Sequence, residues 1–182
     1  RMPGASVREV AGQLLHDSML QMSLTGLRRF FLSLEQDINA LQQVELLSGF
    51  DRDHLRLLAF GSQQLSFSKG YDIFYEGQKS DSGYLVLSGL ISVSIRQDGE
   101  PVHKADHGPG AMLGELALIS ETVRTYTATV KENCSLLKIP RTTMHRVLSE
   151  YPDLAIDLHR RISRDVSKFL RQLPEIQAKL SG

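Results

Sequence analysis

Two ionisable residues, Glu115 and Arg124, lie on either side of a short apolar run in the segment "LGELALISETVRTYTATV", residues 113–130. Gly114 directly precedes the carboxylate. A short helix that begins after this glycine would direct unpaired N–H groups and the positive end of its dipole toward an anion. An arginine that returns to the same point would add two parallel donors, which suit a phosphate. With Glu115 accepting a hydrogen bond from a neighbouring hydroxyl, the pattern fits a compact sugar phosphate.

A simpler interpretation needs no ligand. Glu115 can be a first-turn acid that the helix dipole favours, with Arg124 as its salt-bridge partner. A glycine–glutamate pair followed nine residues later by an arginine is a short pattern that occurs by chance. The two residues alone therefore favour this simpler interpretation.

The elements that must position these residues follow from hydrophobic periodicity. Residues 7–60 have a helical pattern, in which a stripe predicts one buried face: Leu27, Phe31, Leu34, Ile38 and Leu41. This stripe either packs on its own domain or forms a dimer seam. Asp53 is predicted to cap a second helix that ends near Gly61.

Residues 64–139 change to short alternating runs that glycines interrupt, which predicts antiparallel strands in a sandwich or barrel. Gln97-Asp98-Gly99 predicts a tight hairpin. Turns are expected at Gly70, Gly77, Gly83, Gly89, Gly99, Gly108 and Gly110. A very short helix at residues 115–119 interrupts the strands.

Helical periodicity returns after Pro140. Residues 141–151 predict one short helix, and Pro152 opens another. The apolar stripe of this last helix comprises Leu154, Leu158, Ile162, Val166, Phe169 and Leu173. Its charged face is expected to be solvated, and Pro174 to break or kink it. The predicted fold is α+β: an antiparallel β-roll, resembling a jelly roll or double-stranded β-helix, flanked by N-terminal and C-terminal helices.

Several motifs in one order connect these elements to a known family. They include "FSKGYDIFYEGQKSDSGYLVLSGLISV", "GPGAMLGELALI", "TATV", "CSLLKIPRTTMHRVL" and "YPDLAIDLHRRI". In these motifs the chain resembles the cyclic nucleotide-binding domain family, the β-roll of catabolite activator protein and of cAMP-dependent kinase regulatory subunits. The resemblance runs from about residue 53 to residue 168. We therefore expect a helical extension over 1–52, a roll with its lid helix over 53–173, and a tail over 174–182.

The resemblance implies a binding site, which we carry over by position. Gly114, Glu115, Leu116 and Ala117 match the start of the family's phosphate-binding cassette, where backbone N–H groups meet the cyclic phosphate and the glutamate holds the ribose 2′-hydroxyl. Arg124 matches the arginine that pairs with the exocyclic phosphate oxygens. The expected ligand is cAMP or cGMP, without a metal, another cofactor or a catalytic residue. The helix from Pro152 onward would be the lid over the base.

Two departures from the family pattern surround the arginine. Val123 stands where the family has proline, and two extra residues separate Arg124 from "TATV". An insertion of two residues preserves strand parity, but it lengthens a loop or bulges a strand, and it could displace Arg124. Tyr126 is an added aromatic that either packs on the roll or stacks on a base, with packing favoured. Thr125 directly follows the arginine, and a hydroxyl at this position resembles that of cGMP-tolerant family members, where it can bond a guanine amino group.

Composition narrows the function classes. Lysine plus arginine balance aspartate plus glutamate at 21 each, which disfavours DNA binding by a broad positive field. The single cysteine, Cys134, lies in an apolar alternating run and favours a reducing, cytoplasmic setting. No apolar run approaches the roughly 20 residues that span a bilayer, so no membrane association is expected.

Three rival interpretations remain beside a regulatory, non-enzymatic nucleotide-binding domain. A cupin-like metal enzyme would need inward-facing histidines, and only His103 and His107 are close in sequence. A transcription factor would need a helix-turn-helix, for which the segment after residue 170 is too short. A degenerate roll would serve as an interaction module, against which the presence of both Glu115 and Arg124 argues. The apolar stripes at both ends are compatible with a homodimer.

Overall fold

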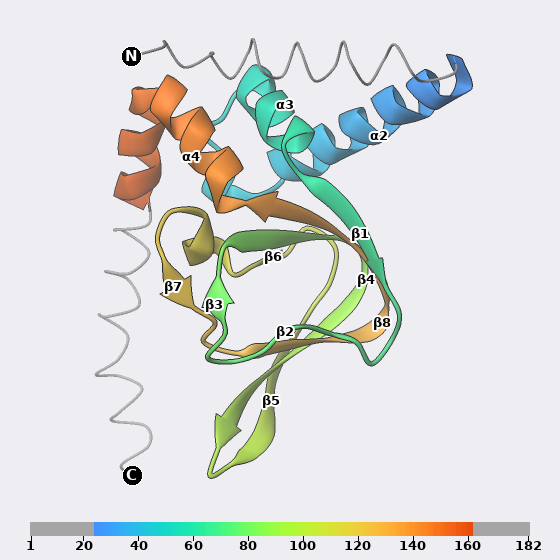
Figure 1. Ribbon diagram of the computed structural model, residues 1–182, viewed down its shortest axis with the longest axis vertical. Coiled ribbons are helices and arrows are strands. Elements are labelled where there is room, and N and C mark those ends of the chain that lie inside the picture. The colour runs from blue at the N-terminus through green and yellow to red at the C-terminus, as the bar shows by residue number, and fades with distance from the viewer. Residues whose placement is uncertain (1–23, 162–182) are drawn as a thin grey trace.

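The computed structural model describes residues 24–161, in which helices cover one end of an antiparallel β-roll (Figure 1). The helical elements are α2 (Leu24–Gln42), η1 (Glu45–Leu47), α3 (Arg52–Phe60), η2 (Glu115–Leu118) and α4 (Arg141–Glu150). The strands are β1 (Gln63–Phe67), β2 (Asp72–Phe74), β3 (Lys79–Ser80), β4 (Ser82–Gln97), β5 (Glu100–His107), β6 (Met112–Leu113), β7 (Thr122–Val123) and β8 (Thr127–Pro140). Residues 152–161 form a further helical segment. The predicted α+β roll is confirmed.

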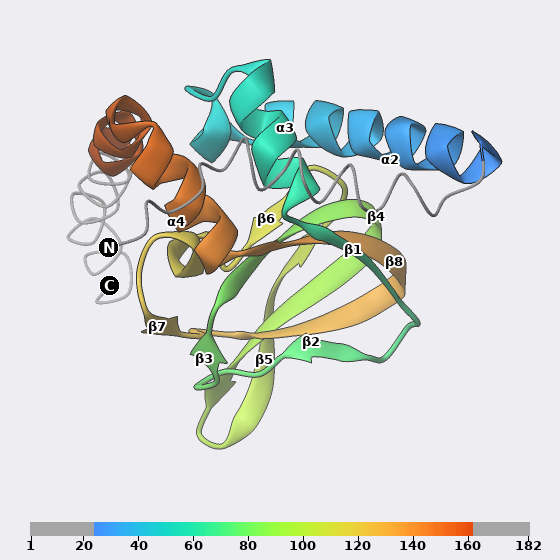
Figure 2. The ribbon, with the colours of Figure 1, turned by 45° about the horizontal axis from the view of Figure 1, so that its top comes forward.

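Two long strands organise the sheet. β4 and β8 pair antiparallel from Ser82 opposite Pro140 to Ser94 opposite Thr127, within the order β1-β8-β4-β5. β2 also pairs with β8, β6 pairs with β4, and β3 with β7 forms a separate two-stranded sheet. Three register shifts interrupt the β4–β8 pairing, and such irregularities let long strands bend. The β4–β5 hairpin projects from the roll at the end opposite the helices (Figure 2).

The predicted hairpin at residues 97–99 is confirmed. Asp98 and Gly99 both have positive φ, 54° and 88°, as a tight two-residue connection requires. The prediction of a turn at Gly83 was wrong, because this residue lies buried inside β4, opposite Ile139. Packing, and not a turn, favours glycine at residue 83, because a Cβ atom there would meet the side chain of Leu118 at 3.1 Å.

The start of α3 also differs from the prediction. Asp51, and not Asp53, is the N-cap, and its side chain accepts hydrogen bonds from the backbone N–H groups of Asp53 and His54. The His54 side chain in turn accepts from the N–H of Asp51, which completes a capping box. Asp53 lies in the first turn and pairs with Arg56. The helix ends at Gly61 as expected.

Two apolar clusters make up the core. One fills the roll interior and includes Phe74, Tyr84, Ile91 and Leu136. The other, the helix-side cluster, lies between the helices and the roll (Figure 2). It joins residues of α2, α3 and α4 to Leu85, Leu118, Leu137 and Ile139. Because Leu118 belongs to η2, the short helix is anchored to the helical layer.

The terminal stripes are described only in part. On α2, Leu34, Ile38 and Leu41 are buried in the helix-side cluster, whereas Phe31 is 45% exposed. In the last helical segment, Leu154 and Leu158 are buried in the same cluster. Leu27 of α2 is half-buried. Four positions of the C-terminal stripe lie outside the described residues, as do Pro174 and residues 1–23: Ile162, Val166, Phe169 and Leu173. No helix within residues 24–161 is long and apolar enough to cross a membrane.

Candidate ligand-binding site

The cassette that begins at Gly114 forms a tight turn followed by one turn of 3₁₀-helix. Gly114 has a left-handed backbone, φ 66° and ψ 37°, and its carbonyl accepts a hydrogen bond from Ala117 N at 3.1 Å. Ala117 and Leu118 are buried, which fixes the helix on the roll. Glu115 and Leu116 are exposed. The short helix predicted at residues 115–119 is therefore present.

Arg124 is held by backbone pairing despite the inserted residues. β7 pairs with β3, and directly after β7 the N–H of Arg124 donates to Gln78 O at 2.8 Å. The carbonyl of Arg124 accepts from Gly77 N at 2.7 Å. Because β8 begins only at Thr127, the two extra residues form a bend after Arg124. The insertion is absorbed downstream and leaves the arginine within the roll.

The Arg124 guanidinium is buried and only partly paired. The residue is 6% exposed, and its Nη2 donates to Ser82 O at 2.8 Å. Within the described part of the chain, its Nε and Nη1 atoms have no hydrogen-bond partner. The carbon at the guanidinium centre lies 4.0 Å from the centroid of the Phe74 ring, a cation–π contact. Burial lowers the pKa of Arg124, an effect that the electrostatic influence of Tyr84, Tyr126 and Asp81 only partly offsets.

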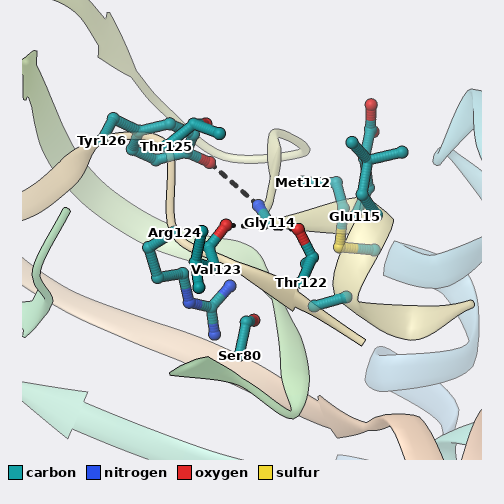
Figure 3. A pocket seen from close by; sticks show the side chains of 11 residues that line it. Ser80, Met112, Gly114, Glu115, Thr122, Val123, Arg124, Thr125 and Tyr126 are labelled. Carbon is teal, nitrogen blue, oxygen red and sulfur yellow. Dashed lines mark hydrogen bonds between the residues drawn. The ribbon is translucent and has the colours of Figure 1, made fainter. Parts of the chain in front are cut away.

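This geometry removes the simpler interpretation of the sequence. The guanidinium makes no hydrogen bond to a carboxylate among residues 24–161. Figure 3 shows the Glu115 side chain directed away from it. Arg124 is therefore not the salt-bridge partner of Glu115. Unsatisfied donors on a buried cation are costly, and an anion that accepts hydrogen bonds would satisfy them.

One cavity brings the predicted binding residues together (Figure 3). It has a volume of about 170 Å³. Its lining includes all six predicted residues, Gly114, Glu115, Leu116, Ala117, Arg124 and Thr125, and also Ser80 and Tyr126. That these residues bind a ligand stays a prediction.

Tyr126 is one of the lining residues that the predicted site did not include. Its ring packs against Phe74 with a centroid distance of 5.4 Å, so the expected packing on the roll is confirmed. Its hydroxyl also accepts a hydrogen bond from Gly114 N at 2.9 Å. Burial raises the pKa of Tyr126, so the hydroxyl is neutral at neutral pH and is no counter-ion for Arg124. Its position in the insertion was the only sequence signal.

The two histidines of the cupin alternative are separated by a β-bulge. A register shift occurs where Val93 faces Ala105 and Ser94 faces His103. The burial pattern of β5 then places His107 on the half-buried face and His103 on the exposed face. His103 contacts Asp106, whose carboxylate also binds Lys131, and these two hydrogen bonds lower the Asp106 pKa to about 2. The described residues contain no group of three metal-ligating side chains.

The comparisons with known proteins decide the family. The family model of the cyclic nucleotide-binding domain matches residues 64–151 of this chain. A solved cyclic nucleotide-binding-like protein from Brucella abortus is 37% identical, with a TM-score of 0.58 over 62% of this chain and 97% of that one. This chain belongs to the cyclic nucleotide-binding domain family.

Other members of the family share the fold. The catabolite activator protein of Thermus thermophilus is 26% identical, with a TM-score of 0.62 over 72% of this chain and 62% of that protein. The regulatory domain of Toxoplasma gondii PKA, solved with cAMP, has a TM-score of 0.64 over 76% of this chain and 51% of its own. At 21% identity, this second likeness concerns the fold alone.

Curated relatives of the domain are much longer proteins. Lysophospholipase NTE1 of Chaetomium globosum is 32% identical over 124 residues, which are 68% of this chain and 8% of that protein. Lysophospholipase nte1 of Neurospora crassa is 31% identical over 112 residues, 61% of this chain and 7% of that protein. The chain thus spans less than a tenth of the length of these relatives.

Proposed function

We propose that this domain binds a cyclic nucleotide, cAMP or cGMP, through Gly114, Glu115, Leu116, Ala117, Arg124 and Thr125. The observation that carries the proposal is the buried Arg124 guanidinium, which lines the cavity with two nitrogens unpartnered among the described residues. A phosphate suits such a fork of donors, because its oxygens accept charge-assisted hydrogen bonds. Family membership supplies the ligand class.

Each residue has a role in this proposal. Arg124 would pair with the exocyclic phosphate oxygens, and the backbone from Gly114 to Ala117 would lie against the phosphate. Glu115, exposed at the cavity, would accept a hydrogen bond from the ribose 2′-hydroxyl. Phe74 supports the site from inside the roll, because its ring lies against the guanidinium and limits its orientations.

Base preference would depend on Thr125. This residue is exposed and lines the same cavity, next to Arg124. A threonine hydroxyl can accept a hydrogen bond from the guanine amino group, which adenine lacks. We expect Thr125→Ala to weaken cGMP binding about threefold to tenfold and to leave cAMP binding unchanged. An equal loss for both nucleotides would contradict this role.

The flanking helices would transmit binding. At the start of α4, Arg141 Nη1 donates to the carbonyls of Ser80 at 3.0 Å and Ser120 at 3.1 Å. Ser80 lines the cavity, and Ser120 follows η2. Leu118 of η2 packs in the helix-side cluster with Leu154 and Leu158. A shift of η2 on binding would therefore change the packing of the helices, which is the differential contact that a switch needs.

Two further parts of the proposal concern the larger assembly. The exposed Phe31 and Leu32 of α2 support a homodimer through the outer face of this helix. Analytical ultracentrifugation of wild type and Leu32→Glu tests the dimer.

The curated relatives support a regulatory role within a longer lysophospholipase. Lysophospholipid hydrolysis by the full-length protein, with and without cAMP or cGMP, tests the regulatory role.

Titration calorimetry with cAMP, cGMP and 5′-AMP tests the central proposal. We expect one of the cyclic nucleotides to bind and 5′-AMP to bind more weakly. Arg124→Ala should lose about 2–5 kcal/mol of binding free energy if the pair with phosphate is buried. Arg56→Ala is the matched control, since Arg56 is exposed on α3 and pairs with Asp53. Absence of heat and of thermal shift with both cyclic nucleotides would refute the proposal.

A further inference from the structure

The Tyr126 hydroxyl occupies a backbone donor of the proposed binding cassette. Its oxygen lies 2.9 Å from Gly114 N, and Figure 3 shows the tyrosine directed at the glycine across the cavity. In the ligand-free protein, this contact satisfies an N–H that would otherwise face the cavity. A ligand oxygen that approaches the Gly114 N–H must therefore displace the hydroxyl.

The small volume of the cavity also indicates that Tyr126 must move before a ligand binds. It measures about 170 Å³, whereas pockets that enclose drug-sized ligands span about 300–1,000 Å³. The ring of Tyr126 lines this space between Phe74 and Gly114. Moving this ring is the most direct way to enlarge the cavity, because Arg124 is held by its backbone and by Ser82.

The backbone around Tyr126 is compatible with such a movement. Thr125 and Tyr126 form a bend between β7 and β8, outside the strands. The bend is fixed on both sides: Arg124 pairs with Gly77 and Gln78, and Thr127 Oγ1 accepts from Glu76 N at 3.1 Å. The Tyr126 side chain is partly exposed, which leaves room for another rotamer. Because Tyr126 lies outside the strands, a change of its rotamer breaks no strand pairing.

We propose that Tyr126 is an intramolecular competitor of the nucleotide: it closes the cavity through Gly114, and it must leave the cassette before a cyclic nucleotide binds. This inference rests on the proposed function. Tyr126 would then help to set the affinity for the nucleotide. We expect the wild-type protein to bind a cyclic nucleotide more weakly than it would if Tyr126 did not contact Gly114. The cost of displacing the hydroxyl is included in every binding constant.

The test compares Tyr126→Phe with wild type. Phenylalanine keeps the ring against Phe74 and removes the hydroxyl, so the Gly114 N–H loses its partner. Tyr71→Phe is the matched control, because Tyr71 is exposed, stacks on Phe67 and lies outside the cavity. We expect Tyr126→Phe to bind cAMP or cGMP about threefold to tenfold more tightly than wild type, and Tyr71→Phe to bind within twofold of it.

A second measurement needs no ligand. Hydrogen exchange of the Gly114 amide in the free protein should be faster in Tyr126→Phe than in wild type, and unchanged in Tyr71→Phe. If Gly114 exchange does not change, the hydroxyl does not protect the cassette and the inference is wrong. If wild type binds nucleotide and Tyr126→Phe binds equally or more weakly, the inference is wrong but the proposed function stands. If neither protein binds a cyclic nucleotide, both fail.

Discussion

The Nη1 atom of Arg124 lies directly over Gly114, so close that a Cβ atom at residue 114 would come within 2.0 Å of it. No real Cβ tolerates this approach, and the positive φ of 66° independently favours glycine. The Arg124 guanidinium thus lies where a side chain at residue 114 would be, although the two residues belong to different segments of the chain. This contact places the buried cation at the start of the cassette.

Gly114→Ala should lose stability for two reasons, the backbone conformation and the contact with Arg124. Gly110→Ala is the matched control, since Gly110 has φ 87° and open space around its Cα. We expect about 1–2 kcal/mol of destabilisation at Gly110 from the left-handed backbone alone. At Gly114 we expect a further loss of about 1 kcal/mol or more, together with loss of nucleotide binding. Urea unfolding measures both variants, and equal losses would contradict the close approach.

Arg124→Met should leave the ligand-free protein at least as stable as wild type. The substitution removes a buried, incompletely paired cation and retains an apolar chain against Phe74. It also removes the bond to Ser82 O, so we expect a net gain of about 0–2 kcal/mol in the free energy of unfolding. Arg141→Met is the control and should be destabilising, because Arg141 donates to two carbonyls. A loss above about 1 kcal/mol in Arg124→Met would contradict the argument.

Asp37→Asn tests a buried carboxyl on α2. Asp37 is 6% exposed, and its Oδ1 accepts from Gln64 Nε2 at 2.6 Å. Burial raises the Asp37 pKa, and the bond from Gln64 opposes this only in part. The unfolded state therefore loses its proton first as the pH rises, so wild type loses stability from the ordinary aspartate pKa up to the raised one.

Asparagine retains the acceptor and does not ionise. We expect Asp37→Asn to exceed wild type in stability at pH 7, by up to about 1 kcal/mol. The difference should disappear below the ordinary aspartate pKa, where both side chains are neutral. Urea unfolding at pH 7 and at about pH 3 measures it. An advantage for Asn that persists unchanged in acid would exclude ionisation as its cause.

Asp51→Ala tests the N-cap of α3. Loss of a capping side chain costs about 0.5–2 kcal/mol. Asp53→Ala should cost less, because Asp53 forms an exposed pair with Arg56. Thermal unfolding of the two variants ranks them, and a larger loss for Asp53→Ala would reverse the assignment of the cap.

Local patterns in the sequence determined most of the fold. Alternating apolar residues predicted the strands, Asp98 and Gly99 predicted the hairpin, and Gly61 marked the end of α3, because each depends on interactions between neighbours in the chain. The family motifs likewise brought Gly114, Glu115 and Arg124 together as a candidate site. Where the prediction failed locally, at the α3 cap, two aspartates two residues apart competed for one position.

Long-range contacts decided what the sequence left open. The position of Arg124 after a two-residue insertion depends on backbone bonds to Gly77 and Gln78, more than 40 residues earlier in the chain, and no local pattern encodes this pairing. A bulge against β4 separated His103 from His107, although their even spacing is compatible with a shared strand face. Tyr126 reached Gly114 only because the bend after Arg124 turns its side chain into the roll. The sequence thus determined which groups are available, and tertiary pairing decided which of them meet.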